Sequence, residues 1–350
     1  MKSSYKKEDV TLLLKDITGL LQPEATEERE RQIQAGRHYS EMLPLEYVPS
    51  EEYMRAYYAA LESCAEATAA AVGVLADRII IEKGRAVILV SLARAGIPIG
   101  ILLKRYLKRK YDVDVPHYTI SIIRGKGIDK NAIAYLLERY AAERLLFVDG
   151  WIGKGAIGKE LREAVKDFPG LSGELAALAD PANITRLCGT HEDILIPSSC
   201  LNCTVSGLIS RTVLRDDIIG PQDFHGAVYY GEMQDKDVSY AFIEEIESRF
   251  QMDNQPEMET PAAGTGREEA EEIAGHFGIT DVNMVKPGIG ETTRVLLRRV
   301  PWRVLVAEGC REDPALHHLL TLAKEKKVLV EYYPLQHYKA CGIIRKLADT

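Results

Sequence analysis

The sequence predicts an α/β protein in which a parallel sheet flanked by helices is followed by a small C-terminal α/β/α sandwich. Apolar, strand-like segments alternate with helix-like segments over residues 1–250, and this rhythm is typical of parallel βαβ units. Two of the strand-like segments run into glycine-containing loops that precede a helix. Residues 251–266 contain two prolines and two glycines and interrupt the rhythm. We therefore predict a linker there, between domains at residues 1–250 and 267–350.

The elements of the first domain follow from its apolar runs and helix-capping residues. In chain order they are an alanine-rich helix at 51–77, a strand at 86–90, a helix at 101–111, a strand at 116–123, a helix at 129–141 capped by Asp129, a strand at 145–148, a strand at 226–230 and a helix at 237–250. Parallel strands end at one edge of their sheet, so the loops that bind ligands are expected at the carboxyl ends of these strands.

Composition bounds the class of protein. The 350 residues are 46% hydrophobic and 27% charged, as in ordinary globular proteins. No apolar run approaches the roughly 18 residues that span a membrane, and the polar start does not resemble a secretory signal. We therefore expect a cytoplasmic protein without a membrane partner. Its six cysteines are too few for a disulfide framework in so long a chain and are expected to be reduced.

Charge is shared unevenly along the chain. Residues 265–350 hold 13 Lys and Arg against 12 Asp and Glu, whereas residues 1–264 hold 31 against 40. The acidic excess disfavours general nucleic-acid binding by the N-terminal part and leaves it open to the C-terminal part.

The most informative segment, residues 145–158, predicts an anion site. An apolar strand ends in an acid, a glycine-rich loop follows, and a helix begins. The N–H groups of such a loop, together with the helix N-terminus, can hold a phosphate. The residues expected around the anion are Asp149, Gly150, Gly153, Lys154, Gly155, Ala156 and Ile157.

Three interpretations of this segment compete with a ribose-phosphate loop. Residues 153–158 fit the dinucleotide pattern G-x-G-x-x-G, although residues 149–152 separate them from the predicted strand. Residues 153–159 fit G-x-x-x-x-G-K, but Glu160 stands where a magnesium-binding hydroxyl is expected. The third is a tight turn without a ligand.

The segment also resembles the phosphoribosyl diphosphate loop of type I phosphoribosyltransferases. The match consists of the apolar residues 145–148, then Asp149, two apolar residues and a short glycine-containing turn. The resemblance implies that Asp149 holds ribose hydroxyls, that the amides of residues 150–157 with Lys154 hold the 5′-phosphate, and that Mg²⁺ accompanies the ligand. Gly150 departs from the family, which usually has a second acid there.

A second loop supports this resemblance. The predicted strand at 86–90 is followed by Ser91-Leu92-Ala93-Arg94-Ala95-Gly96, and phosphoribosyltransferases carry a loop of this kind that binds pyrophosphate. Ser91 and Ala95 belong to the same loop. The resemblance implies that Arg94 donates to the pyrophosphate, while Gly96 allows a close backbone approach.

Residues 188–215 leave several interpretations open. Cys188, His191, Cys200 and Cys203 have a spacing that zinc accepts. The alternative is that the cysteines are buried small residues and His191 faces solvent, around a core strand at 194–196. A cysteine nucleophile paired with His191 or His225 is a further alternative. Thr204, Ser206 and Arg211 indicate either an additional substrate loop or a capped helix with a surface arginine.

Taken together, residues 91–96, 147–150, 200–214 and 224–227 resemble the bacterial family labelled "cysteine protease StiP", over roughly residues 20–250. That domain has been reinterpreted as phosphoribosyltransferase-like and linked to tellurite-resistance and stress operons. The protease label makes Cys200 the natural nucleophile. The phosphate loops favour a transferase that binds phosphoribosyl diphosphate or a related ribose phosphate. A non-catalytic nucleotide sensor associated with RNA is the remaining alternative.

The segment from about residue 267 resembles the Pelota-type RNA-binding domain, an α/β/α sandwich. Its expected elements are a first helix, a strand at 302–308, a helix at 314–326 and a strand at 327–332. The resemblance implies RNA contacts at a helix start, and the matching residues are Gly288, Gly290, Glu291, Thr293 and Arg294. The alternative is that Arg294, Arg298 and Arg299 form one solvated helix face.

Overall fold

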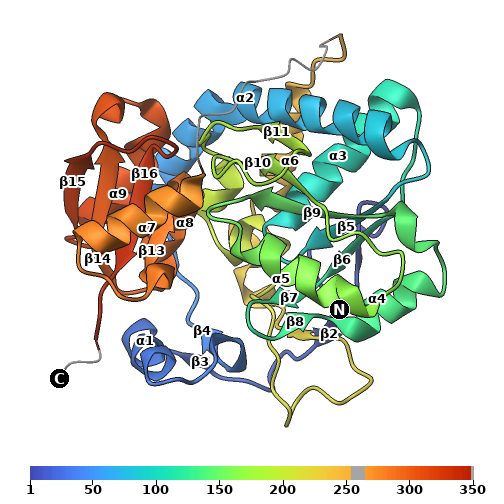
Figure 1. Ribbon diagram of the computed structural model, residues 1–350, viewed down its shortest axis with the longest axis horizontal. Coiled ribbons are helices and arrows are strands. Elements are labelled where there is room, and N and C mark those ends of the chain that lie inside the picture. Colours follow the sequence, from blue (N-terminus) through green and yellow to red (C-terminus); the bar gives the residue numbers. More distant parts are fainter. Residues whose placement is uncertain (254–264, 348–350) are drawn as a thin grey trace.

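The computed structural model describes residues 1–253 and 265–347. Most of the predicted linker, residues 254–264, lies outside the described residues. Figure 1 shows a large α/β unit beside a smaller C-terminal one, with one long helix reaching along the top of the large unit.

The large unit is built on a six-stranded, wholly parallel sheet, as the sequence predicts. Its strand order is β1-β6-β5-β9-β10-β11, and every neighbouring pair runs parallel. The strands are β1 (Thr11–Leu12), β5 (Ile88–Leu92), β6 (His117–Ile120), β9 (Leu145–Trp151), β10 (Leu175–Ala179) and β11 (Cys188–Thr190).

Helices cover both faces of this sheet. One hydrophobic core joins the sheet to α2 (Glu51–Lys83), α3 (Gly96–Tyr111) and α6 (Ser239–Ser248). A second core joins its other face to α4 (Lys130–Leu137) and α5 (Ala156–Ala164). The Asp129 side chain caps α4 by accepting from the Ala132 amide at 3.0 Å, as expected. The α/β class is confirmed; the phosphoribosyltransferase-like form of the fold remains a prediction.

Four local predictions were wrong. The strand expected at 226–230 is limited to β12 (Gly226–Ala227), which pairs with β2 (Lys15–Asp16) outside the main sheet. The strand expected at 116–123 breaks after Ile120, because β7 (Ile122–Ile123) leaves the sheet to pair with β8 (Gly127–Ile128). Residues 194–196 are not a strand, although Leu195 and Ile196 are buried. No helix begins near Thr204, which lies in a single 3-10 turn at 203–205.

The C-terminal unit is the predicted α/β/α sandwich. Its sheet has the order β13-β16-β14-β15, from β13 (Val285–Pro287), β14 (Pro301–Ala307), β15 (Leu329–Tyr333) and β16 (Ala340–Ile344). Helix α7 (Gly266–His276) packs on one face. Helices α8 (Ile289–Arg298) and α9 (His317–Glu325) pack on the other, and their core is continuous with that of α2. The two units therefore share one hydrophobic core.

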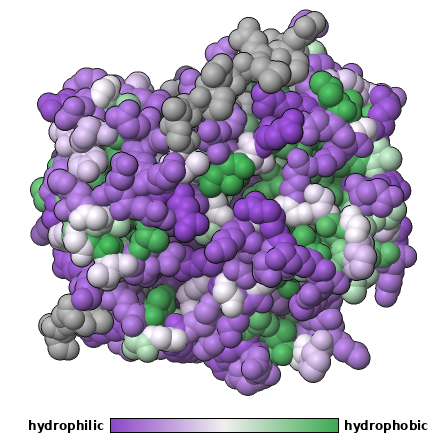
Figure 2. Space-filling model, in the orientation of Figure 1, coloured by the Kyte–Doolittle hydropathy of each residue, from purple (hydrophilic) through white to green (hydrophobic). Residues whose placement is uncertain are grey.

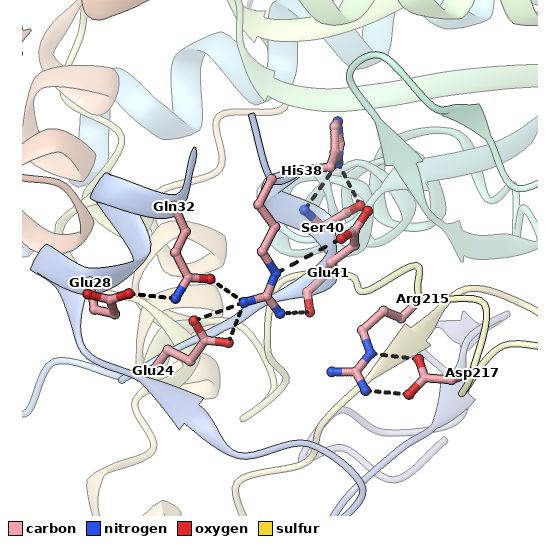
Figure 3. A network of polar contacts seen from close by, with 9 residues as sticks. Glu24, Glu28, Gln32, His38, Ser40, Glu41, Arg215 and Asp217 are labelled. Atoms are coloured by element: carbon pink, nitrogen blue, oxygen red, sulfur yellow. Dashed lines mark hydrogen bonds and ion pairs between the residues drawn. The ribbon is translucent and has the colours of Figure 1, made fainter. Parts of the chain in front are cut away.

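The N-terminal segment wraps around the large unit through short pairings. Strands β2 (Lys15–Asp16) and β12 (Gly226–Ala227) pair, as do β3 (Pro23–Glu24) and β4 (Leu43–Pro44). Figure 3 shows how helix α1 (Thr26–Gln34) is fixed between them. The Arg37 guanidinium contacts Glu24 at 3.2 Å and also bonds Gln32 and the Glu41 carbonyl. This anchors the helix that carries Arg29.

The visible face of the molecule is mostly hydrophilic, with hydrophobic side chains in small separate patches (Figure 2). No helix among residues 1–253 and 265–347 is long and apolar enough to cross a membrane.

Candidate anion site between the two units

The main candidate site is a cleft of about 290 Å³ where the β9–α5 loop faces the C-terminal unit. Seven of its lining side chains are cationic and two are acidic. The cationic ones are Arg29, Arg124, Lys154, Arg211, Lys286, Arg294 and Arg299, and the acids are Asp149 and Glu291. A second hollow of about 240 Å³ adjoins the cleft and shares five of these cations, adding Arg94 and Arg298. Such an excess of positive charge suits an anionic ligand with more than one charged group.

Asp149 lies at the carboxyl end of β9, as predicted, and lines the cleft. Its Oδ1 accepts a hydrogen bond from the Gly150 amide at 2.8 Å. Burial raises the pKa of Asp149 to about 6, and Glu291 raises it further, against the Gly150 amide and Arg294. A carboxylate with one free oxygen at the floor of a cationic cleft can accept hydrogen bonds from ligand hydroxyls.

The glycine loop follows the strand more closely than expected. Strand β9 continues to Trp151, so only residues 152–155 separate it from α5. The prediction that residues 149–152 hold the loop away from the strand was wrong, which removes one objection to the dinucleotide pattern. Gly155 has φ of +78° at the N-cap of α5, and Gly153, Ala156 and Ile157 line the cleft with it. The first amides of α5 have no intrahelical acceptor and can face an anion.

The Lys154 side chain of this loop is already hydrogen-bonded to the C-terminal unit. Its ammonium donates to the carbonyls of Val282 and, at 2.8 Å, Val285 in the C-terminal unit. Burial lowers the pKa of Lys154 to about 8. The structure thus places this side chain between the units, and its predicted role as a phosphate ligand would require it to give up these carbonyls.

The 91–96 loop lies beside the glycine loop, because β5 and β9 are neighbours. Arg94 is 7% exposed; its Nη1 donates to the Ile209 carbonyl at 2.7 Å, and its Nη2 has no partner. Ser91 is buried behind the loop and donates to the Gly96 carbonyl at 2.9 Å. A Cβ on Gly96 would lie 2.3 Å from the Val148 carbonyl. Glycine is therefore required at position 96 because the backbone there approaches strand β9 closely. The sequence had predicted a close approach to a ligand instead. Ala95 lines the cleft.

Sequence reasoning missed Arg29. It is 1% exposed, its Nε and Nη1 have no hydrogen-bond partner, and it lines both hollows. Arg29 belongs to the highly charged run of residues 26–32, a pattern that predicts a solvent-exposed helix. Only the packing of α1 under the cleft turns this guanidinium inward.

Arg211, predicted as either a substrate-loop or a surface residue, lines both hollows and lies over the Tyr39 ring at 4.2 Å. Thr204 and Ser206 are buried away from the cleft, and the Ser206 hydroxyl donates to the Asn202 carbonyl at 2.7 Å. Only Arg211 of these three faces the candidate site.

The helix start expected to bind RNA faces the large unit. Ile289 donates its amide to Asp193 at 3.1 Å, so this carboxylate covers the start of α8 at Gly288. A Cβ on Gly290 would lie 2.6 Å from the Trp151 ring, over which Arg294 stacks at 4.4 Å.

Of the remaining residues of that motif, Glu291 lines the cleft. Thr293 is buried and contacts His318 at 2.9 Å, on the side of α9. Asp193, which sequence reasoning missed, is the residue that joins the two units here. It bonds the Lys339 amide at 2.9 Å as well, and burial raises its pKa to about 6.

The cysteines do not assemble a metal site. Cys200 lies in the main hydrophobic core, while Cys203 contacts Met233 at 3.6 Å in another. No group of three or more His, Cys, Asp or Glu within residues 1–253 and 265–347 could hold a metal ion. The predicted zinc spacing is therefore not realised, and the buried-residue interpretation holds. All six cysteines are free thiols, as expected.

Cys200 has the surroundings of a structural cysteine. It is fully buried, and burial raises its pKa well above the ordinary thiol range. Its carbonyl accepts from the Tyr53 hydroxyl at 2.6 Å. A nucleophilic cysteine needs a stabilised thiolate, which an apolar core disfavours.

A different cysteine meets a histidine. Cys188 Sγ lies 3.4 Å from Nε2 of His191, and Nδ1 of His191 is 3.1 Å from the Asp180 carbonyl and 3.8 Å from its carboxylate. The Arg78 guanidinium lies 3.8 Å from the same sulfur. His225, the other histidine considered, contacts Ser121 at 2.8 Å instead.

Comparison with known proteins assigns the chain to a family. Residues 3–247 match the family model described as "Tellurite-like stress resistance cysteine protease StiP". The chain belongs to the StiP family. Residues 264–346 match the "PELOTA RNA binding domain". The resemblances to the StiP family and to the Pelota domain are therefore confirmed. The two matches meet near the predicted linker.

A curated StiP relative covers nearly the whole chain. The "Cysteine protease StiP" of Acinetobacter baylyi is 34% identical over 364 aligned positions, which cover 98% of this chain and 94% of the relative. The names of the StiP family and of this relative favour the peptidase alternative over the transferase interpretation. Within this StiP chain, however, the thiol that meets a histidine is that of Cys188, not the expected Cys200.

Proposed function

We propose that the cleft binds a phosphorylated ribose compound of the phosphoribosyl diphosphate type. The observation that carries this proposal is the buried, unpartnered guanidinium of Arg29 within a ring of cations around Asp149. An uncompensated buried charge is costly, and an anionic ligand would relieve that cost. The N-terminus of α5 supplies further donors to a phosphate.

The proposed reaction is ribosyl transfer. The bond between ribose C1 and the diphosphate breaks, pyrophosphate leaves with the electron pair, and an acceptor lone pair forms the new bond to C1, while the acceptor's proton passes to solvent. Asp149 would hold ribose hydroxyls, and Arg94 would donate to the departing pyrophosphate through its free Nη2. Fixed donors of this kind stabilise the developing charge.

Mg²⁺ fits this site only as a companion of the ligand. Asp149 is the sole carboxylate that the β9 tip offers, and Glu291 on the facing wall lies 3.5 Å from the Arg294 guanidinium. Protein-bound Mg²⁺ commonly takes one or two carboxylates and completes its shell with substrate phosphates and water. Asp149 and the diphosphate would then hold the ion together, and the ion would neutralise part of the negative charge of the diphosphate.

Calorimetric titration with phosphoribosyl diphosphate and Mg²⁺ tests the proposal. We expect saturable binding by the wild type and at least tenfold weaker binding by Asp149→Asn. Asp216→Asn, an exposed site outside the cleft, is the matched control. Unchanged affinity in Asp149→Asn would refute the assignment.

Binding without release of pyrophosphate across a panel of acceptors would favour the non-catalytic sensor. The supporting feature of that alternative is Gly150, which stands in place of a second acid.

A cysteine peptidase is the second candidate function. It is supported by the printed names of the family and relative, and by the chain of contacts from Cys188 through His191 to Asp180. His191 lines a cavity of about 920 Å³ on the C-terminal side. Nucleophilic catalysis requires a thiol beside a histidine whose other ring nitrogen is held by an acceptor, here the Asp180 carbonyl. Cys188 is as fully buried as Cys200, so a peptide would have to reach it from the side of His191.

Hydrolysis of fluorescent casein tests this second candidate. Cys188→Ala and His191→Ala should abolish hydrolysis, whereas Cys200→Ala should retain it. Cys64→Ala, at a free and partly exposed thiol, is the matched control. A wild type without hydrolysis, or a fully active Cys188→Ala, would reject the peptidase.

RNA binding is proposed for the C-terminal unit on the strength of its family match. The start of α8 is covered by Asp193 and Trp151. RNA would reach this helix only after the two units separate.

A further inference from the structure

The C-terminal unit contributes three cationic side chains to the cleft. The RNA-binding motif at the start of α8 does not explain why these side chains face the large unit. Lys286 lies in β13 and Arg294 in α8, and Arg299 directly follows α8. All three line both hollows. A ligand that fills both hollows therefore lies beside all three side chains.

Their bonding states differ. Arg299 donates to both carboxylate oxygens of Glu30, at 2.5 and 2.9 Å, and is thereby neutralised. The Lys286 ammonium has no hydrogen-bond acceptor within residues 1–253 and 265–347. Arg294 reaches only Glu291, at 3.5 Å, and the Trp151 ring. Two cations of the C-terminal unit thus remain available to a ligand.

Arg29 gives independent evidence that an anion belongs at this position. Its guanidinium is 1% exposed, and two of its nitrogens have no hydrogen-bond partner among the described residues. Among the residues that the structure describes, the nearby Arg211 guanidinium has only the Tyr39 ring as a partner. Arg29, Arg211, Lys286 and Arg294 therefore line both hollows. Among the described residues, Glu291 is the one acid that also lines both, while Asp149 lines only the larger.

The units are docked firmly enough to act as one binding site. Tyr338 donates its hydroxyl to the Gly153 carbonyl at 2.5 Å, and Lys154 bonds Val285. Arg124 donates to Asn283 at 3.0 Å on another side of the same cleft. The glycine loop is therefore held directly by the C-terminal unit.

We propose that Lys286 and Arg294 of the C-terminal unit are ligand-binding residues of the same cleft, and that they hold the negatively charged middle of a ligand bearing at least two phosphate groups. This inference rests on the proposed function in its choice of ligand class. It goes beyond that function by making the site bipartite, since the C-terminal unit supplies four of the nine cationic side chains that line the two hollows. The C-terminal unit then acts as a specificity element for the small molecule.

The test measures binding of inorganic pyrophosphate and of phosphoribosyl diphosphate, each with Mg²⁺, to the full chain by calorimetry. Lys286→Gln and Arg294→Gln should each weaken both probes at least tenfold. Lys324→Gln and Arg109→Gln, exposed positions on α9 and α3, remove the same charge outside the cleft and should leave affinity unchanged. Circular dichroism and melting curves confirm that each variant is folded.

The outcomes separate the two proposals. If Asp149→Asn weakens phosphoribosyl diphosphate binding while Lys286→Gln and Arg294→Gln do not, the bipartite site is overturned and the ribose-phosphate proposal stands. If the two C-terminal variants lose pyrophosphate affinity and Asp149→Asn retains both probes, the bipartite site stands and the ribose assignment fails. A wild type that binds neither probe overturns both.

Discussion

At the scale of single residues, the molecule combines buried charges that are paired with others that are not. Asp193 is compensated by two amides of the C-terminal unit. Asp149 has one amide, and Arg29 retains two unpartnered nitrogens. Unsatisfied buried groups lower stability and are concentrated where ligands bind. The cleft therefore has the features of a site built for binding at some expense of stability.

Asp149→Asn should stabilise the free protein while it impairs ligand binding. Burial raises the pKa of Asp149 to about 6 from its ordinary value near 3.8. The folded state therefore binds more protons than the unfolded chain between these pH values, and wild-type stability falls as pH rises from about 4 to 6. Asn has no charge to bury. We expect it to gain about 1–2 kcal/mol above pH 6, less than the full 1.36 kcal/mol per pKa unit because water screens part of the charge.

Thermal melts at pH 4 and pH 7 measure this effect. The melting temperature of Asp149→Asn should exceed that of the wild type at pH 7, and the two should converge at pH 4. Asp216→Asn should show no such pH-dependent difference. An Asp149→Asn protein that is less stable than the wild type at pH 7 would mean that the carboxylate is compensated in the free protein.

At the scale of elements, two strand–loop–helix units of the large unit were predictable, because each is local in sequence. Apolar residues 145–148 and 86–90 lie within or beside β9 and β5, and the loops after them meet at one sheet edge. β16 (Ala340–Ile344) escaped prediction although it is central in its sheet. Its short alanine-, cysteine- and glycine-containing run has no period that separates a strand from a turn.

Helix α8 shows how tertiary packing redirects an element. A Cβ at Gly290 would lie 2.6 Å from Trp151, so Gly290→Ala should push the helix from the glycine loop and cost about 1–3 kcal/mol. Gly275→Ala in α7 is the matched control, since a Cβ there meets nothing within 4 Å. That control should be stabilised by about 0.5–1 kcal/mol.

Urea unfolding measures the change in the free energy of unfolding for both variants. Trp151 fluorescence, measured in a Trp302→Phe background so that only one of the two tryptophans remains, reports on the interface directly. Equal stability of Gly290→Ala and the wild type, with unchanged Trp151 emission, would show that α8 does not rely on this contact.

At the scale of the whole molecule, the site is assembled from segments that no local pattern connects. Arg29, Arg211 and Lys286 come from three distant parts of the chain and converge only because α1, the β9–α5 loop and the C-terminal unit pack together. Sequence reasoning found the loops that carry backbone donors and left the role of Arg211 open. It missed Arg29 and Lys286, since a charged side chain in a polar run carries no sign of burial. The sequence predicted the start of α8 correctly, but it did not predict that this helix start faces the large unit.

This arrangement predicts competition between RNA and a small anion. RNA that contacts α8 at Gly288 and Arg294 has to displace Asp193 and Trp151, whereas pyrophosphate in the cleft would draw Lys286 and Arg294 toward the large unit. Saturating pyrophosphate with Mg²⁺ should therefore weaken binding of a fluorescently labelled RNA at least tenfold in anisotropy titrations at fixed ionic strength. Asp193→Ala, which uncovers the Ile289 and Lys339 amides, should strengthen RNA binding, while Asp193→Asn keeps an acceptor and should change it less. RNA affinity that is indifferent to pyrophosphate and to Asp193→Ala would place the RNA on another surface of the C-terminal unit and leave α8 to the cleft alone.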